Sequence, residues 1–97
     1  IALQSEGNYV RIVVGGEGKH KSKLLRGSLS GMEAQLNQHP SLMRIHRTSI
    51  VNTANITELK GDSQGGKVWL RGLSSPLPVS RKHIRVLKQR VSSSLIV

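Results

Sequence analysis

The chain has 97 residues, which allows one small domain with a modest core. Fifteen Lys and Arg residues face five Asp and Glu residues, and the resulting formal charge of +10 indicates a polyanionic partner. The absence of cysteine excludes disulfides and thiolate metal sites, and no apolar run approaches the roughly 20 residues of a membrane span. The alternative that this is only a soluble basic domain, without a polyanionic partner, stays open. A peripheral membrane protein is disfavoured because the basic residues are spread along the whole chain.

The beginning of the chain predicts a β-hairpin. Residues 8–14 alternate between apolar and polar side chains, and the glycine-rich segment 15–18 is expected to supply the positive-φ positions of the hairpin connection. On the returning strand Lys19, Lys21 and Lys23 share one face. These lysines form either a solvated surface or a stripe that contacts phosphates.

A short helix is predicted after the hairpin. Ser30 and Glu33 have the spacing of a capping box, with Leu29 placed to pack against the first turn. Pro40 prevents the helix from extending further. We expect this helix to close over one end of the sheet and assign it no chemistry.

The central segment predicts a strand with cationic side chains. Met43 and Ile45 are expected on one face and Arg44 and His46 on the other, while residues 48–51 are suited to completing the strand. Such an element would hold cations above a sheet or at its rim, where an anionic partner could bind.

Three more strands are predicted in the second half of the chain. Asn52 is expected to begin a turn, and strands are expected at residues 56–60, 67–71 and 73–79. Two prolines interrupt the last of these, which suits an edge strand or an irregular one.

A final helix is predicted to begin after Ser80 as its N-cap, because apolar residues at 84, 87 and 91 repeat at helical spacing. Arg81 and Lys82 in its first turn oppose the helix macrodipole. Cations beside the free N–H groups of a helix start favour a phosphate or base-edge site. A tolerated surface cluster is the alternative.

No pattern of catalytic or metal-ligating residues is present. The five carboxylates fall on separate predicted elements and the four histidines are isolated from one another. His46 is better explained as a hydrogen-bonded structural residue or phosphate contact than as a metal ligand. We therefore expect a protein that is not an enzyme and that holds no metal or cofactor.

The aromatic content favours duplex DNA over other nucleic acids. Modules that bind RNA or single strands commonly stack bases on several aromatic rings. This chain has one Tyr, one Trp and no Phe. Duplex DNA, held through its phosphates and read at base edges by Arg, Asn and Lys, fits better.

Three ordered segments carry a family resemblance. Residues 44–52, with the sequence RIHRTSIVN, closely resemble the RIHRSYIVN core of the LytTR family of bacterial DNA-binding domains. Residues 6–10 upstream and 78–81 downstream also match that family in order, so the resemblance covers most of the chain. Ile1 lies close to the first motif, and part of an N-terminal strand is therefore expected to be missing.

The resemblance implies a mainly β fold, an elongated arrangement of small antiparallel sheets with two short helices. It implies a cytoplasmic bacterial transcription regulator, typically the output domain of a response regulator in a two-component system. Residues 1–97 would then be a single domain excised from a longer regulator that carries a sensor or receiver domain. The partner would be double-stranded promoter DNA with direct repeats, an arrangement compatible with a homodimer on DNA.

The resemblance also assigns roles to individual residues. Matching the three DNA-contacting segments of the family implies base reading by Asn8, Tyr9, Arg47 and Arg81. Contacts to the DNA backbone would come from Lys21, Lys23, Arg44, His46, Ser80 and Lys82, with His46 acting more through orientation or packing than through base reading. The alternative function is an RNA-binding or ribosome-associated basic domain, and a protein-interaction module ranks third.

Overall fold

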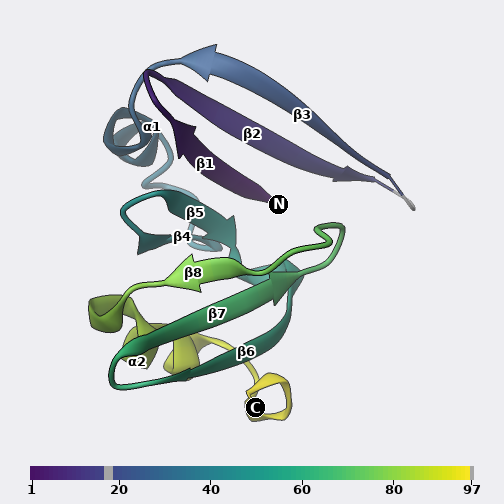
Figure 1. The fold of residues 1–97 in the computed structure, drawn as a ribbon, viewed down its shortest axis with the longest axis vertical. Coiled ribbons are helices and arrows are strands. Elements are labelled where there is room, and N and C mark those ends of the chain that lie inside the picture. The colour runs from purple at the N-terminus through teal and green to yellow at the C-terminus, as the bar shows by residue number, and fades with distance from the viewer. Residues whose placement is uncertain (17–18, 97) are drawn as a thin grey trace.

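The computed structural model describes residues 1–16 and 19–96 and contains two antiparallel sheets and two α-helices (Figure 1). The principal-axis extents of the molecule are 35 × 30 × 24 Å. The predicted mainly β fold, with small antiparallel sheets and two short helices, is confirmed.

The larger sheet has five strands in the order β3-β2-β1-β5-β4. These strands are β1 (Ala2–Glu6), β2 (Tyr9–Gly16), β3 (Lys19–Arg26), β4 (Leu42–His46) and β5 (Ser49–Asn52). The local sequence pattern did not predict β1, which lies between β2 and β5 and pairs with both. The short helix α1 (Leu29–Gln35) connects β3 to β4.

The smaller sheet has three strands in the order β6-β7-β8. They are β6 (Ile56–Asp62), β7 (Gly65–Leu70) and β8 (Leu77–Val79), and helix α2 (Arg81–Arg90) follows β8 directly. Short 3-10 turns lie at Thr53–Asn55 and Ser93–Leu95. The proline-containing strand is an edge strand, as predicted, but it is only three residues long.

Two apolar clusters use opposite faces of the larger sheet. Leu29 of α1 packs with Leu3, Val10 and Ile50 on one face. On the other face, Ala2, Ile45 and Val51 join the apolar side chains of the smaller sheet and of α2 in one larger cluster. Successive strand residues point to opposite faces. Ile50 and Val51 therefore serve the two clusters in turn.

The central segment forms a hairpin rather than one strand. β4 ends at His46, Arg47 and Thr48 form the turn, and β5 begins at Ser49. The β-branched run had suggested a continuous strand. Strand propensity is a local property, and it does not indicate that a side chain from β4 stabilises a turn at this point of the chain. As predicted, Asn52 begins a turn, where its side chain accepts a hydrogen bond from Ala54 N.

Two local predictions need correction. The N-cap of α1 is Ser28, whose hydroxyl accepts from Gly31 N at 3.0 Å, and the predicted cap Ser30 lies inside the helix. Gly15 and Gly16 are both paired within β2, and Gly15 does not have a positive φ. The remainder of that predicted connection, at residues 17–18, lies outside the described residues.

Helix length bears on membrane insertion. Among residues 1–16 and 19–96, no helix is both long and apolar enough to cross a bilayer.

Candidate nucleic-acid interface

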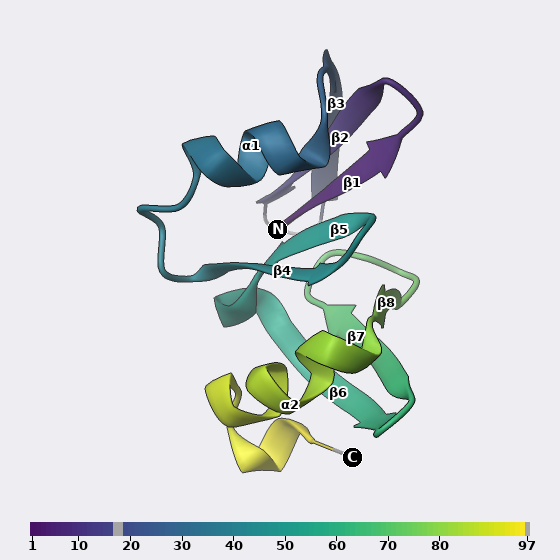
Figure 2. The same cartoon turned by 90° about the vertical axis from the view of Figure 1, so that its left-hand side faces the viewer.

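Three segments predicted to contact DNA lie along one edge of the molecule, and Figure 2 shows them following one another along the long axis. They are the β1–β2 turn, the β4–β5 turn and the start of α2. Ser5 N donates to Thr48 O at 2.9 Å, which joins the end of β1 to the β4–β5 turn. Ser80 N donates to Ile45 O at 2.8 Å, which joins the start of α2 to β4. Backbone hydrogen bonds therefore fix the spacing of all three segments.

The β1–β2 turn presents Asn8 and Tyr9 to solvent. Gly7 has a φ of 60°, a conformation that favours glycine, and it allows the chain to reverse within two residues. Asn8 is exposed, and Tyr9 is 44% exposed at the start of β2. The neighbouring Glu6 carboxylate forms an ion pair with Arg11, so its negative charge is offset within the protein.

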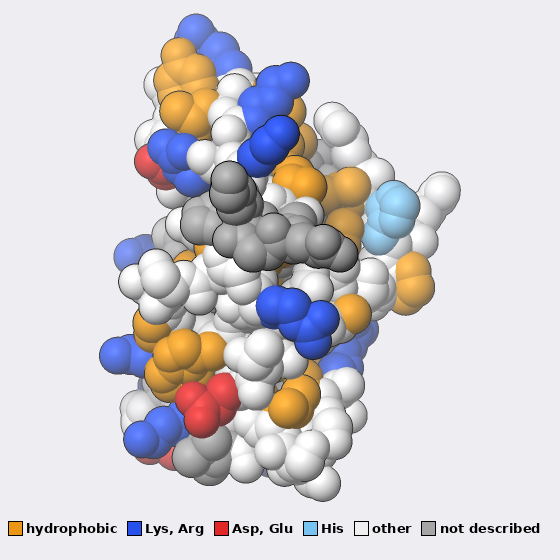
Figure 3. Space-filling model, turned by 90° about the vertical axis from the view of Figure 1, so that its right-hand side faces the viewer, with side chains coloured by type: hydrophobic (Ala, Val, Ile, Leu, Met, Phe, Trp, Pro, Cys, Tyr) orange, Lys and Arg blue, Asp and Glu red, His pale blue; other side chains and the backbone are white. Residues whose placement is uncertain are grey.

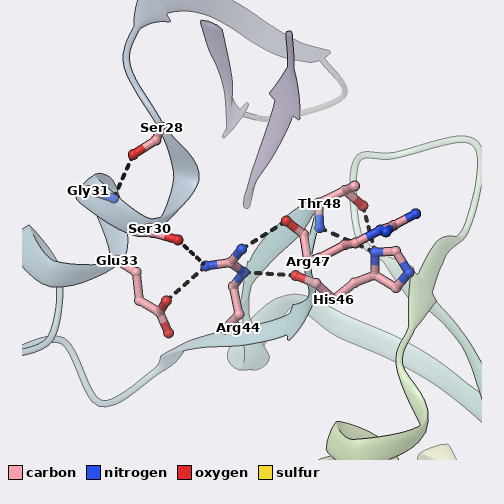
Figure 4. Close-up of polar contacts among 8 residues, drawn as sticks. All are labelled: Ser28, Ser30, Gly31, Glu33, Arg44, His46, Arg47 and Thr48. Atoms are coloured by element: carbon pink, nitrogen blue, oxygen red, sulfur yellow. Dashed lines mark hydrogen bonds and ion pairs between the residues drawn. The ribbon is translucent and has the colours of Figure 1, made fainter. Parts of the chain in front are cut away.

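The β4–β5 turn is held by one arginine (Figure 4). Arg44 Nε donates to His46 O and Arg44 Nη2 donates to Arg47 O, both at 2.8 Å. Arg44 Nη1 forms an ion pair with Glu33 of α1 at 2.8 Å and lies 3.5 Å from Ser30 Oγ. Each nitrogen of this guanidinium already has a partner within the protein. The role of Arg44 as a phosphate contact stays a prediction, but its visible role is to shape the turn that exposes Arg47.

His46 is also tied to this turn. Its Nδ1 lies 2.7 Å from Thr48 Oγ1 and accepts a 3.2 Å hydrogen bond from Thr48 N. A ring nitrogen that accepts from a backbone N–H carries no proton. The neutral ring therefore holds its proton on Nε2. This contact agrees with an orienting role for His46.

The start of α2 faces the same turn across a hollow of about 520 Å³. Arg47, Lys82, His46 and His83 line it together with Ser30, Glu33, Arg44 and Ser80. Ser80 occupies the predicted N-cap position, but its hydroxyl is hydrogen-bonded to Nδ1 of His83 instead of a backbone N–H. Arg81 lies outside the lining and is exposed.

The cations of the hollow act on the two histidines. Partial burial lowers the pKa of His46, and the charges of Arg47 and Arg44 lower it further. Partial burial likewise lowers the pKa of His83, as do the charges of Lys82 and Arg44, while Glu33 opposes this shift. Both rings are therefore biased toward the neutral form.

Two predicted backbone contacts lie elsewhere. Lys21 and Lys23 are exposed on β3, where Lys23 pairs with Ile12 near the middle of the hairpin and Lys21 pairs with Val14 toward the end away from Tyr9. Lys21 is five residue pairs from the Tyr9 pair, or about 17 Å at the usual rise of a strand. On the side of the molecule opposite the three segments, basic side chains are interspersed with hydrophobic and uncharged ones (Figure 3).

The structure adds residues that the sequence analysis missed. Arg26 is exposed and pairs with Tyr9 across the β2–β3 ladder, so it lies at the end of the hairpin where Asn8 and Tyr9 are. His83 reaches the hollow because positions three apart on a helix lie on the same side, which places it with Ser80. That spacing could have indicated His83 from the sequence, whereas the position of Arg26 depends on strand register.

The described part of the chain contains no group of three or more His, Cys, Asp or Glu side chains that could hold a metal ion. The hollow is instead suited to an anion, because it combines guanidinium, ammonium, imidazole and hydroxyl groups, and its carboxylate, Glu33, is paired with Arg44.

Comparisons with known proteins give the family and the fold. The sequence model of the LytTr DNA-binding domain matches residues 1–92. No curated protein matches the chain significantly. Among solved structures, the chain is similar to the LytTr DNA-binding domain of a protein described as a methyl-accepting/DNA response regulator from Bacillus cereus. That match has a TM-score of 0.70 and 20% sequence identity, and it covers 92% of this chain and 77% of the other.

Proposed function

This chain belongs to the LytTR family of DNA-binding domains, and we propose that it regulates transcription by reading direct repeats in double-stranded DNA. The observation that carries this proposal is the alignment of the β1–β2 turn, the β4–β5 turn and the start of α2 along one edge (Figure 2). Each of these segments presents at least one exposed residue that can bond to DNA: Asn8, Arg47 and Arg81.

The size of the edge suits one face of a duplex. The long axis of the molecule is 35 Å, close to the rise of one turn of B-DNA, which is about 34 Å. A domain that lies along the duplex therefore covers about one helical turn, and the three segments follow one another within that length, with the β4–β5 turn in the middle. Repeats separated by about one helical turn would let two copies bind on the same side, as a homodimer or as independent molecules.

The chemistry of the three segments divides into base reading and phosphate binding. Arg81 and Arg47 carry the guanidinium forks that can bond to O6 and N7 of guanine, and Asn8 can bond to adenine. Tyr9 lies beside Asn8 and completes that contact segment. Lys82, Ser80 and His46 line the hollow between the two lower segments, where they can bind a phosphate.

The cellular setting follows from the same proposal. The similar structure from Bacillus cereus is described as part of a response regulator. We expect this domain to be the output part of a cytoplasmic bacterial regulator, with a receiver or sensor domain elsewhere in the full-length protein. The family is one of DNA-binding domains rather than of enzymes.

The first test is selection of binding sites from a library of random duplexes, followed by salt titration on the enriched site. We expect an enriched direct repeat and an affinity that falls steeply with salt, because each bound phosphate releases counterions. Binding of structured RNA as tightly as the selected duplex would contradict the proposal. So would a steep salt dependence without any enriched sequence, since that describes a general polyanion binder.

A further inference from the structure

The hollow beside the β4–β5 turn contains two histidines that come from different elements. His46 ends β4 and His83 lies in the first turn of α2, and the backbone bond from Ser80 N to Ile45 O holds the two elements together. Arg47 and Lys82 line the same hollow. Arg44 and Glu33, which pair with each other, line it too, so this volume contains two titratable rings, three cationic side chains and one carboxylate.

Both imidazoles are anchored in the same way. Nδ1 of His46 contacts the Thr48 hydroxyl, and Nδ1 of His83 contacts the Ser80 hydroxyl. A hydroxyl can donate to an unprotonated ring nitrogen or accept from a protonated one. Both hydroxyl contacts can therefore persist when the ring gains a proton, whereas protonation of Nδ1 of His46 replaces the hydrogen bond that this atom accepts from Thr48 N. Within the described part of the chain, neither Nε2 has a hydrogen-bond partner, so each is available to a ligand.

The charges around the rings oppose protonation in the free protein. Arg47 and Arg44 face His46, while Lys82, Arg44 and His46 itself face His83, so the charge gained by one ring opposes protonation of the other. Glu33 is the carboxylate in the hollow, but it is ion-paired with Arg44 and is not free to balance two added charges. A bound anion would reduce the net positive charge of the hollow. Protonation of the rings in the absence of an anion would increase that charge.

We propose that this hollow binds a DNA phosphate and that His46 and His83 take up protons from solution as the duplex binds. The inference rests on the proposed function of the same edge, because the duplex supplies the phosphate. The single negative charge of a phosphate offsets part of the field of Arg47 and Lys82, and its oxygens can accept hydrogen bonds from Nε2 of both rings. Each added proton comes from the buffer and occupies the unprotonated ring nitrogen, so the bound state holds more protons than the free state.

The sign of the pH dependence follows. Because burial and nearby cations lower the pKa of His46 and His83 in the free protein, binding a phosphate raises each pKa again. Proton uptake on binding means that affinity increases as the pH falls through the range between the free and bound pKa values. The increase is at most about tenfold per pH unit for each proton taken up.

The experiment measures the dissociation constant of the domain for a duplex between pH 5.5 and 8 at fixed ionic strength. Two duplexes are used, the one selected from the random library and a random-sequence duplex of equal length. The variants are His46→Gln, His83→Gln and the double variant, with His39→Gln as the matched control because His39 is exposed outside the hollow. We expect both duplexes to bind more tightly at low pH, since a phosphate is present whatever the sequence.

The double variant is expected to lose most of this pH dependence and the His39→Gln control to keep it. An equal pH dependence in all variants, or none in the unaltered domain, would overturn the proposal while leaving the DNA-binding function intact. Failure of any duplex to bind at any pH would contradict the proposed function as well.

A measurement on the unaltered domain keeps the test independent of variant folding. Titration of the histidine ring protons by NMR, with and without the duplex, should show that the pKa values of His46 and His83 rise on binding. Unchanged pKa values at His46 and His83 in the complex would overturn the proposal.

Discussion

Arg44 illustrates how one residue can position the side chain of another, here the predicted DNA contact Arg47. Its guanidinium bonds to the carbonyl oxygens of His46 and Arg47 and to the Glu33 carboxylate, and its side chain is only 18% exposed. The fork geometry of arginine makes these simultaneous bonds possible. Arg44 thereby fixes the turn that presents Arg47 and anchors that turn to α1.

Replacing Arg44 by lysine tests this supporting role. Arg44→Lys keeps the charge, but one ammonium group cannot bond to two carbonyls and a carboxylate in the same geometry. We expect a loss of about 1–3 kcal/mol in the free energy of unfolding, measured in urea, together with weaker DNA binding. Arg11→Lys is the control, because Arg11 pairs with the exposed Glu6. Equal, small effects of both substitutions would contradict the assignment.

Arg81 and Lys82 are adjacent, but we expect them to contribute differently to binding. Arg81→Ala should weaken binding to the selected site by about 1–3 kcal/mol and relax the preference for one base pair, because a bidentate base contact is lost. Lys82→Ala should weaken selected and random duplexes alike and reduce the dependence of affinity on salt. Equal losses on both duplexes for Arg81→Ala would exclude base reading by this residue.

At the scale of elements, α1 shows how closely spaced signals can mislead. Ser28 and Ser30 are both followed by a possible first helical turn, and the Glu33 that completes a capping box with Ser30 instead pairs with Arg44 of β4. The helix begins two residues earlier than predicted. Leu29 is thereby in its first turn and packs under the helix against the larger sheet.

The two serines make a matched pair for mutation. Ser28→Ala removes the hydroxyl that accepts from Gly31 N, and loss of such a cap typically destabilises by about 1 kcal/mol. Ser30→Ala should have a smaller effect, since Ser30 is an exposed residue within the helix. The free energy of unfolding measures both. A larger effect at Ser30 would restore the capping box as the better description.

The β2–β3 hairpin also has two ends with different expected roles. Arg26 pairs with Tyr9 near the β1–β2 turn, whereas Lys21 pairs with Val14 toward the other end. If DNA lies along the edge proposed here, Arg26→Ala should weaken binding to every duplex and Lys21→Ala should weaken it less. Gel-shift titration at low salt compares the two substitutions. The opposite order would mean that the duplex follows the lysine-bearing face of β3.

For the whole molecule, the larger apolar cluster holds the three contact segments in one frame. Leu87 of α2 is fully buried with Ile45 of β4 and with Leu59 and Val68 of the smaller sheet. The helix that carries Arg81 and the hairpin that carries Arg47 therefore share one core. Loss of packing there should loosen the whole edge, not one contact.

Leu87→Ala tests this coupling. Truncation of a buried leucine typically lowers the free energy of unfolding by about 2–5 kcal/mol, and thermal or urea unfolding measures the loss. Val86→Ala is the control on the same helix, because Val86 is 41% exposed and should cause only a small change. Comparable losses for both would show that α2 is not anchored through this cluster.

Much of the secondary structure could be predicted because it depends on local patterns. Val68 and Leu70 are buried and Trp69 is less so, as their alternation indicated, and Ile84 and Leu87 form the buried face of α2 at helical spacing. The local pattern did not predict β1, because its segment ALQSE shows little alternation of apolar and polar residues. It is stabilised instead by pairing with strands on both sides. The turn at Arg47 was not predicted because it is stabilised by the side chain of Arg44, which Glu33 of α1 holds in place.

The sequence by itself determined the charge of the protein, most of its strands and helices, and the three motifs that indicate its family. These are properties of residue type and short-range spacing. Only the tertiary structure decided that the three motifs meet on one edge, that Arg44 supports the turn, and that His83 shares a hollow with His46 while Lys21 lies apart. Those relations depend on strand register, on backbone bonds between distant segments and on the shared core, and no local pattern specifies them.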